Sequence, residues 1–172
     1  MRQLLAGLVA ATVIACAMAS EPLQPDGPLK TLPVAGTAVH YFTSAIIHSQ
    51  TPTATGMIQR STDIIELKGD LKGRVLYHPT SVFDFTTGRL VNTGNQVFSG
   101  TVLDSAPVLL HDDEFRFEVD LNSGALESGE VHLIDRIVGP KIRCDLVAVG
   151  KGDTTPEGDS IVDYSGTCTF RQ

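Results

Sequence analysis

The chain has 172 residues, 42% of them hydrophobic, no tryptophan, and a formal net charge of −7 at pH 7. This length suits one domain that buries a core of its own. An acidic surface repels phosphate backbones, so the charge argues against nucleic acid as a partner.

The N-terminus, residues 1–19, has the features of a secretory signal peptide. Arg2 supplies a positive charge, and the apolar run from Leu4 to Ile14 follows it, flanked by small residues. A retained transmembrane helix is the alternative. Such a span needs about 20 apolar residues, and this run is diluted by glycine, threonine and alanine. We therefore predict that the protein is exported.

Two overlapping cleavage signals end this segment. The sequence "AMA" predicts a cut after Ala19, whereas "VIAC" resembles the bacterial lipobox, in which the chain is cut before Cys16 and this cysteine is acylated. The first cut predicts a soluble periplasmic or secreted protein. The second predicts a lipoprotein of the bacterial envelope that meets the membrane only through its lipid. Residues 20–36 favour lipidation, because their prolines disfavour helix and strand and suit an extended tether.

Strand signals dominate residues 37–172, the predicted folded domain. In "FRFEVDL" apolar and charged residues alternate, so Phe117 should be buried and Glu118 should face water. "DIIELKGDLKGRVLY" predicts a hairpin in which Gly69 and Asp70 form a two-residue turn, with glycine at the first, positive-φ position.

Other segments with strand character are joined by turns rich in Gly, Pro, Asn and Asp. These strands are expected at residues 39–48, 74–85, 96–103, 130–138, 142–148 and 162–170. About eight strands without crossover helices favour an all-β fold with a single antiparallel β-barrel, and a β-sandwich is the alternative.

Three cysteines occur, and either cleavage removes Cys16 from disulfide pairing. Cys144 and Cys168 each fall on the apolar face of a late strand, and in an oxidising compartment we predict a disulfide between them. Free buried thiols are the alternative. No CxxC or HxxxH spacing supports zinc, so no metal site is predicted.

A glycine-punctuated run, "GDLKGRVLYHPTSVFDFTTGRLVNTGNQVFSGTV", resembles the eight-stranded barrels of the allene oxide cyclase and dirigent type, in which "SGT" or "TGT" precedes a strand. The resemblance extends over residues 56–170. It implies a lumen that shapes a reactive conformer, as in a cyclase or isomerase. No segment matches the catalytic acid or proton donor of that family, so the catalytic residues stay unknown. Lipocalins carry an early Gly-x-Trp signature, which a chain without tryptophan lacks.

Two acidic segments contain oxygen ligands of the kind that Ca²⁺ binds. "HDDE", residues 111–114, has four adjacent side chains that point in opposing directions on an extended segment, so we interpret it as an acidic loop. "GKGDTTPEGDS", residues 150–160, lacks the order of an EF-hand loop. No GxSxG, HExxH or GxGxxG motif occurs, and no cofactor is predicted.

Three histidines are candidate ligand-binding residues. His40 and His48 share strand parity with Phe42, and His78 shares parity with Leu76. If these faces line a barrel lumen, the imidazoles could orient a ligand or move a proton. The alternative is that they hydrogen-bond to neighbours without a functional role.

Three functions follow from these features. The favoured one is a barrel that binds a small apolar ligand without catalysing a reaction. The alternatives are a cyclase or isomerase, and an interaction protein whose barrel is filled by its own side chains. A cavity would separate the third from the others, and a buried titratable pair within it would favour catalysis. The oligomeric state is left open.

Overall fold

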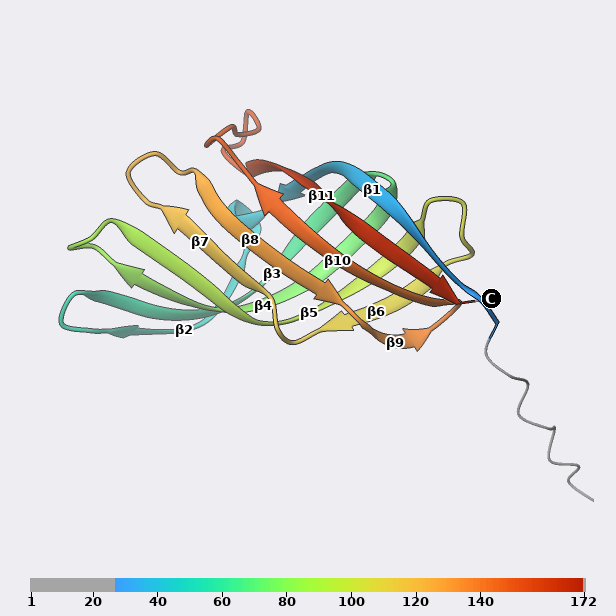
Figure 1. Ribbon diagram of the computed structural model, residues 1–172. Coiled ribbons are helices and arrows are strands. Elements are labelled where there is room, and N and C mark those ends of the chain that lie inside the picture. Colours follow the sequence, from blue (N-terminus) through green and yellow to red (C-terminus); the bar gives the residue numbers. More distant parts are fainter. Residues whose placement is uncertain (1–26, 172) are drawn as a thin grey trace, which may run out of the picture.

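The computed structural model describes residues 27–171, which form a β-barrel (Figure 1). The predicted signal peptide, both cleavage signals and Cys16 lie outside the described residues. The strands are β1 (Leu29–His40), β2 (Ile46–Pro52), β3 (Gly56–Gly69), β4 (Leu71–Asp84), β5 (Arg89–Val102), β6 (Val108–Asp112), β7 (Arg116–Asp120), β8 (Leu126–Leu133), β9 (Asp135–Val138), β10 (Lys141–Val149) and β11 (Ser160–Arg171). One 3-10 turn, η1 (Phe42–Ser44), follows β1. Within the described range, no helix has the length and apolar character needed to cross a membrane.

The sheet closes on itself. Antiparallel pairings run from β3 through β1, β11, β10, β8, β7, β5 and β4, and β4 pairs again with β3. β5 pairs with β7 along one part of its length and with β6 along the other, and β6 also pairs with β9. The result is an eight-stranded closed antiparallel barrel with three additional strands, β2, β6 and β9. The predicted barrel is confirmed, and the sandwich is not formed.

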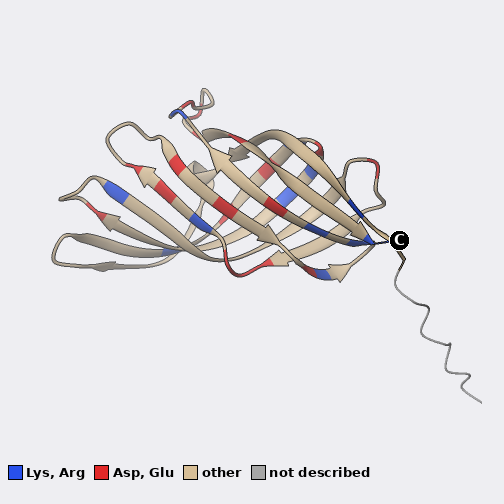
Figure 2. Ribbon diagram, in the orientation of Figure 1, with Lys and Arg blue, Asp and Glu red and all other residues tan. Residues whose placement is uncertain are grey.

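Side chains alternate between the lumen and the outer surface, as the sequence pattern predicted. In β10 every second residue is buried, from Ile142 to Ala148. In the "FRFEVDL" segment Phe117 is buried, whereas Glu118 lies on the outer side and forms ion pairs with Arg89 and Arg116. Figure 2 shows Lys and Arg residues interspersed with Asp and Glu residues along the strands. The alternation therefore assigns one face to the core and the other to solvent.

The start of the folded domain differs from the prediction. Residues 29–36, expected to belong to the tether, form the first part of β1 and pair with β11, and residues 39–48 are two strands separated by η1. Pro33 fits in this strand for a geometric reason. The Ala35 N–H donates to the Asp70 side chain and therefore points away from β11. Backbone nitrogens two residues apart in a strand point to the same side, so the nitrogen of Pro33 also points away from β11, to an edge of β1 that pairs with no strand at this position. The proline removes no ladder hydrogen bond there.

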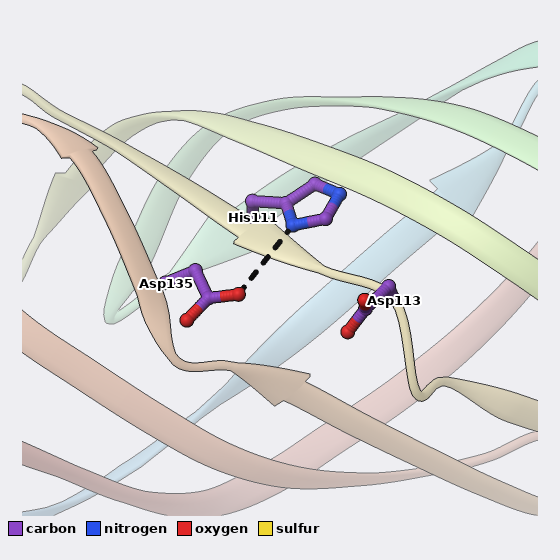
Figure 3. A group of neighbouring side chains, drawn as sticks. All are labelled: His111, Asp113 and Asp135. Carbon is purple, nitrogen blue, oxygen red and sulfur yellow. Dashed lines mark ion pairs between the residues drawn. The ribbon is translucent and has the colours of Figure 1, made fainter.

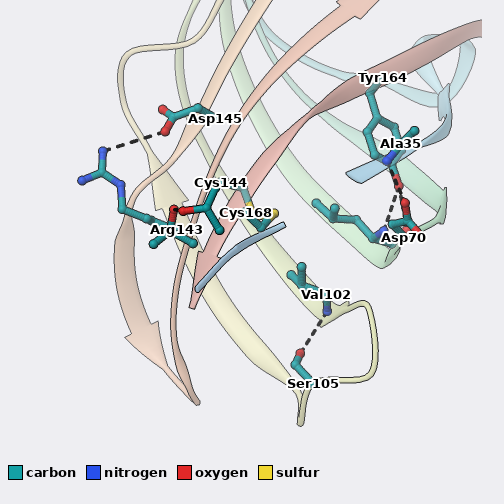
Figure 4. The surroundings of a disulfide bond; sticks show 12 residues. Ala35, Asp70, Val102, Ser105, Arg143, Cys144, Asp145, Tyr164 and Cys168 are labelled. Atoms are coloured by element: carbon teal, nitrogen blue, oxygen red, sulfur yellow. Dashed lines mark hydrogen bonds and ion pairs between the residues drawn. A yellow bond between two sulfur atoms is a disulfide. The ribbon is translucent and has the colours of Figure 1, made fainter. Parts of the chain in front are cut away.

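The predicted hairpin between β3 and β4 is confirmed, with glycine in a positive-φ conformation, but Gly69 and Asp70 do not form a two-residue turn, because the last pair in the register is Leu67 and Gly73. The Tyr164 hydroxyl holds the turn in place (Figure 4). Gly69 has a φ of 108° and precedes Asp70 between β3 and β4. The Tyr164 hydroxyl reaches this turn from β11 and accepts a hydrogen bond of 2.8 Å from the Leu71 N–H. Gly36 leaves the space for it, because a Cβ there would overlap the hydroxyl. The turn is thus tied across β1 to the last strand.

We expect Tyr164→Phe to lower the free energy of unfolding by about 1–3 kcal/mol, because the buried Leu71 N–H loses its partner. Urea denaturation measures the change. Tyr41→Phe is the matched control, since the Tyr41 hydroxyl bonds to Glu66 on the outside of the barrel. Equal, small losses in both variants would contradict a structural role for the Tyr164 hydroxyl.

The predicted disulfide is present: Cys144 and Cys168 are bonded and stand directly opposite each other on β10 and β11. Both lie at the end of the barrel where β1 begins and β11 ends (Figures 1 and 4). This end is filled by side chains that are completely buried, among them Leu71, Phe98 and Leu110. We call it the closed end.

Candidate functional site

The opposite half of the barrel encloses a cavity of about 390 Å³. This volume lies within the range of small-molecule sites in proteins. The cavity reaches from the middle of the lumen to the mouth, where the β4–β5 and β7–β8 hairpins end (Figure 1). Its apolar lining includes Ala38, Ile65, Leu67, Val75, Phe117, Leu126, Val131, Leu133, Leu146, Ala148 and Val162.

The mouth itself carries apolar side chains that face solvent. Phe42 and Ile47 line the cavity and are both about half exposed, and Phe83 also lines it. Phe85, next to Phe83 on the β4–β5 turn, is exposed too, and the two rings are in contact. An apolar molecule could pass this rim without crossing a polar barrier. The site is therefore suited to a ligand with a substantial apolar part.

One wall of the cavity carries an acid–histidine pair. His40, the last residue of β1, points its Nε2 at Oδ2 of Asp63 on β3, 3.0 Å away. Asp63 is 5% exposed, and both residues line the cavity. Of the three histidines singled out from the sequence, His40 is therefore the one that lies on the lumen wall. The pair places two titratable side chains in a pocket that is apolar on most of its wall.

Tyr77 stands directly opposite Asp63 in the register of β3 and β4. Its ring packs against Phe115, Phe117 and His40, which fixes the position of the phenol. Burial raises the pKa of the Tyr77 phenol well above its usual value, and the charge of Asp63 adds to this rise. The hydroxyl therefore stays protonated and available as a hydrogen-bond donor.

Asn92 on β5 completes the polar part of the wall. It is buried and lines the cavity. The polar amide of Asn92 partly offsets the rise in the pKa of the Tyr77 phenol. The two side chains do not, however, form a hydrogen bond of normal geometry. His40, Asp63, Tyr77 and Asn92 come from four successive strands of the barrel wall. We call these four residues the polar wall.

A neighbouring polar contact has a structural role. Gln96, opposite Tyr77 on β5, donates to Oδ2 of Asp112, which is completely buried. Asp112 also accepts from the backbone N–H groups of Glu114 and His132. These bonds connect the segment between β6 and β7 to β5 and to β8. Because its oxygens are occupied, Asp112 offers little to a ligand.

The other two predicted histidines do not line the cavity. Thr62 joins them: its hydroxyl lies 2.7 Å from Nε2 of His48 and 2.9 Å from Nδ1 of His78. His78 shares its face with Leu76, as expected, but that face is outside, because Tyr77 takes the inward position on β4. The shared face of His78 and Leu76 is confirmed, and it does not line the lumen.

The side chains of the "HDDE" segment diverge, as predicted, but the segment is only partly a loop, because His111 and Asp112 are the last residues of β6 and Asp112 is completely buried. His111 and Asp113 face outward and meet Asp135 of β9, with ligand atoms within 4.8 Å of one another (Figure 3). His111 Nδ1 and Asp135 Oδ2 are 3.7 Å apart. Both aspartates are exposed, and exposed acidic groups of this kind occur widely without a metal. We assign no metal site to them.

Sequence reasoning missed Asp63, Tyr77 and Asn92. For two of them a signal existed, since Asp63 has the parity of Ile65 and Leu67, and Tyr77 has the parity of Val75. A polar residue on an otherwise apolar strand face indicates a functional or structural polar contact. Asn92 gave no such signal, because β5 begins seven residues earlier than the predicted strand 96–103.

Comparison with models of protein families, with curated proteins and with solved structures found no match to this chain.

Proposed function

We propose that this barrel is an exported binding protein that holds one small, largely apolar molecule in its lumen. The observation that carries the proposal is the cavity of about 390 Å³, apolar on most of its wall and open at one end. An eight-stranded barrel whose own side chains filled the lumen throughout would leave no such space. The cavity therefore favours ligand binding over a purely structural barrel.

The polar wall gives the site the composition typical of small-molecule pockets. Such pockets are mostly apolar, with a few polar groups that orient the ligand. Here the polar groups lie on one side, and the apolar rim of the mouth lies at the open end. A ligand would place its polar group against β3, β4 and β5 and its apolar part along the rest of the lumen.

Filling the lumen should abolish binding. We expect Ala148→Phe to weaken binding of the neutral apolar dye N-phenyl-1-naphthylamine at least about tenfold, because Ala148 is buried and its Cβ faces the cavity. Fluorescence titration of the purified protein measures the affinity. The matched control is Val147→Phe, whose side chain lies on the outer surface of the same strand.

Both variants should keep the far-ultraviolet circular dichroism of the unsubstituted protein. If Ala148→Phe does not fold, Ala38→Phe fills the same cavity from β1. Unchanged dye affinity in a folded lumen-filled variant would place the dye outside the barrel and contradict the proposal. A native mass spectrum of the protein as purified tests it independently, because a bound molecule adds mass.

A second function, a cyclase or isomerase, is favoured by one specific observation. His40 and Asp63 form a titratable pair inside the lumen, and the protonated phenol of Tyr77 stands beside them. A histidine oriented by a carboxylate can remove a proton, and a nearby phenol can donate one. Solvent deuterium found in a carbon–hydrogen position of a bound ligand would distinguish proton transfer from binding alone.

We further propose that the protein is a lipoprotein of the bacterial envelope, anchored through Cys16, with a soluble periplasmic or secreted form as the alternative. The buried disulfide supports export, because such bonds persist in oxidising compartments. The chain enters β1 at the closed end, where Leu29 pairs with Arg171. An anchor preceding this end would leave the mouth at the far end free for a ligand.

A further inference from the structure

Three buried polar atoms on the lumen wall have no hydrogen-bond partner among residues 27–171: Oδ1 of Asp63, the phenol oxygen of Tyr77 and Oδ1 of Asn92. These residues are 5%, 1% and 7% exposed, and all three line the cavity. A buried polar group without a partner costs free energy, and few occur in folded proteins. A molecule that supplies the missing partners would be stabilised at this position.

The chemistry of the missing partners follows from each group. Oδ2 of Asp63 is occupied by His40, so its Oδ1 remains as an acceptor that needs a donor. The protonated phenol of Tyr77 is a donor that needs an acceptor. Because Asp63 and Tyr77 face each other across two paired strands, one small group can reach both. The amide of Asn92 can donate or accept, depending on its orientation.

Common head groups differ in how well they meet this demand. A hydroxyl both donates to Asp63 and accepts from Tyr77. A carboxylate only accepts, and it would bring a second acceptor and a negative charge against Asp63. An ether also only accepts, and an ammonium group only donates, so each leaves one buried group unpaired.

We propose that the lumen selects molecules that carry a hydroxyl group, as an alcohol, phenol or enol, at the end buried against Asp63 and Tyr77. The remainder of the ligand is apolar and extends toward the mouth. This inference rests on the proposed function and adds the chemical class of the ligand. The phenol is held ready for this role, because Phe115 and Phe117 pack against its ring.

The test is a competition series with four molecules of matched chain length: 1-octanol, octanoate, octylamine and methyl octyl ether. Each is titrated against the protein with bound N-phenyl-1-naphthylamine, and dye displacement gives the affinity. We expect 1-octanol to bind at least about tenfold more tightly than any of the other three, because each of them leaves a buried group unpaired. Octanoate binding as well as 1-octanol, or equal affinities for all four, would overturn the inference while leaving ligand binding intact. If neither the dye nor any competitor binds, the proposed function fails as well.

Tyr77→Phe provides the decisive variant. This substitution removes the phenol hydroxyl from the lumen, so the hydroxyl of 1-octanol keeps its bond to Asp63 but loses its donor. The affinity for 1-octanol should therefore fall about tenfold. Tyr41→Phe makes the same chemical change outside the cavity, where the hydroxyl bonds to Glu66, and should leave all four affinities unchanged. A folded Tyr77→Phe variant with the original preference for 1-octanol would overturn the inference. If this variant does not fold, the ranking of the four molecules on the unsubstituted protein decides.

Discussion

Replacing Phe98 by alanine is expected to lower the free energy of unfolding by about 3–5 kcal/mol. The side chain is completely buried at the closed end, where it stands opposite Val75 on β4 and Leu110 on β6. Its removal loses the transfer free energy of the ring and leaves a cavity that the surrounding strands fill only in part. Urea denaturation at equilibrium, with the slope of the transition compared between variants, measures the loss.

The neighbouring residue supplies the control. Ser99 is exposed on the outer face of β5, so Ser99→Ala should change stability by no more than about 0.5 kcal/mol. A Phe98→Ala loss close to that of Ser99→Ala would mean that the closed end is loosely packed and that the ligand cavity continues through the whole barrel.

Removing the disulfide is expected to cost about 3 kcal/mol. Cys144 and Cys168 are 24 residues apart in sequence, and a crosslink over such a loop restricts the unfolded chain by roughly this amount. In the Cys144→Ala, Cys168→Ala double variant we expect the midpoint of thermal unfolding to fall by about 6–12 °C for a domain of this size. Differential scanning calorimetry of the purified protein measures the shift.

Reduction gives an independent check of the same bond. The unsubstituted protein in dithiothreitol should unfold at nearly the temperature of the double variant, and dithiothreitol should leave the variant unaffected. If intact-mass measurement after alkylation without reduction finds two free thiols in the exported protein, the bond does not form there. The support that the disulfide gives to export would then be lost.

Much of the fold could be predicted from local pattern because a strand with one buried face must alternate with period two. The pattern of "FRFEVDL" placed Phe117 inside, and the pattern of β10 placed Cys144 on the same side as its apolar neighbours. The turn at Gly69 was predictable as well, because only glycine adopts a positive φ there without strain.

Local pattern fails where residues typical of turns lie within a strand. Pro33 suggested a tether, yet it lies within β1. A proline is tolerated there because its nitrogen points to the edge of β1 that no other strand pairs with. The start of β5 was missed because residues 92–95, "NTGN", have the composition of a turn but lie within the strand. Whether a proline or an asparagine fits in a strand depends on how the neighbouring strands pair with it. The sequence of a single segment carries no information on that pairing.

The sequence by itself determined the all-β class and the alternation of most strands, because these depend on residue type and spacing along the chain. It favoured a barrel over a sandwich and a Cys144–Cys168 disulfide over free thiols, and the pairing of the strands decided both. Only the tertiary structure decided which of the candidate histidines faces the lumen, and so separated His40, which lines the cavity, from His78, which does not. It also brought Asp63, Tyr77 and Asn92 together from three strands, with three polar atoms left without partners. Their proximity is set by the register between three consecutive strands, and that register depends on how the strands pair and pack in the closed sheet.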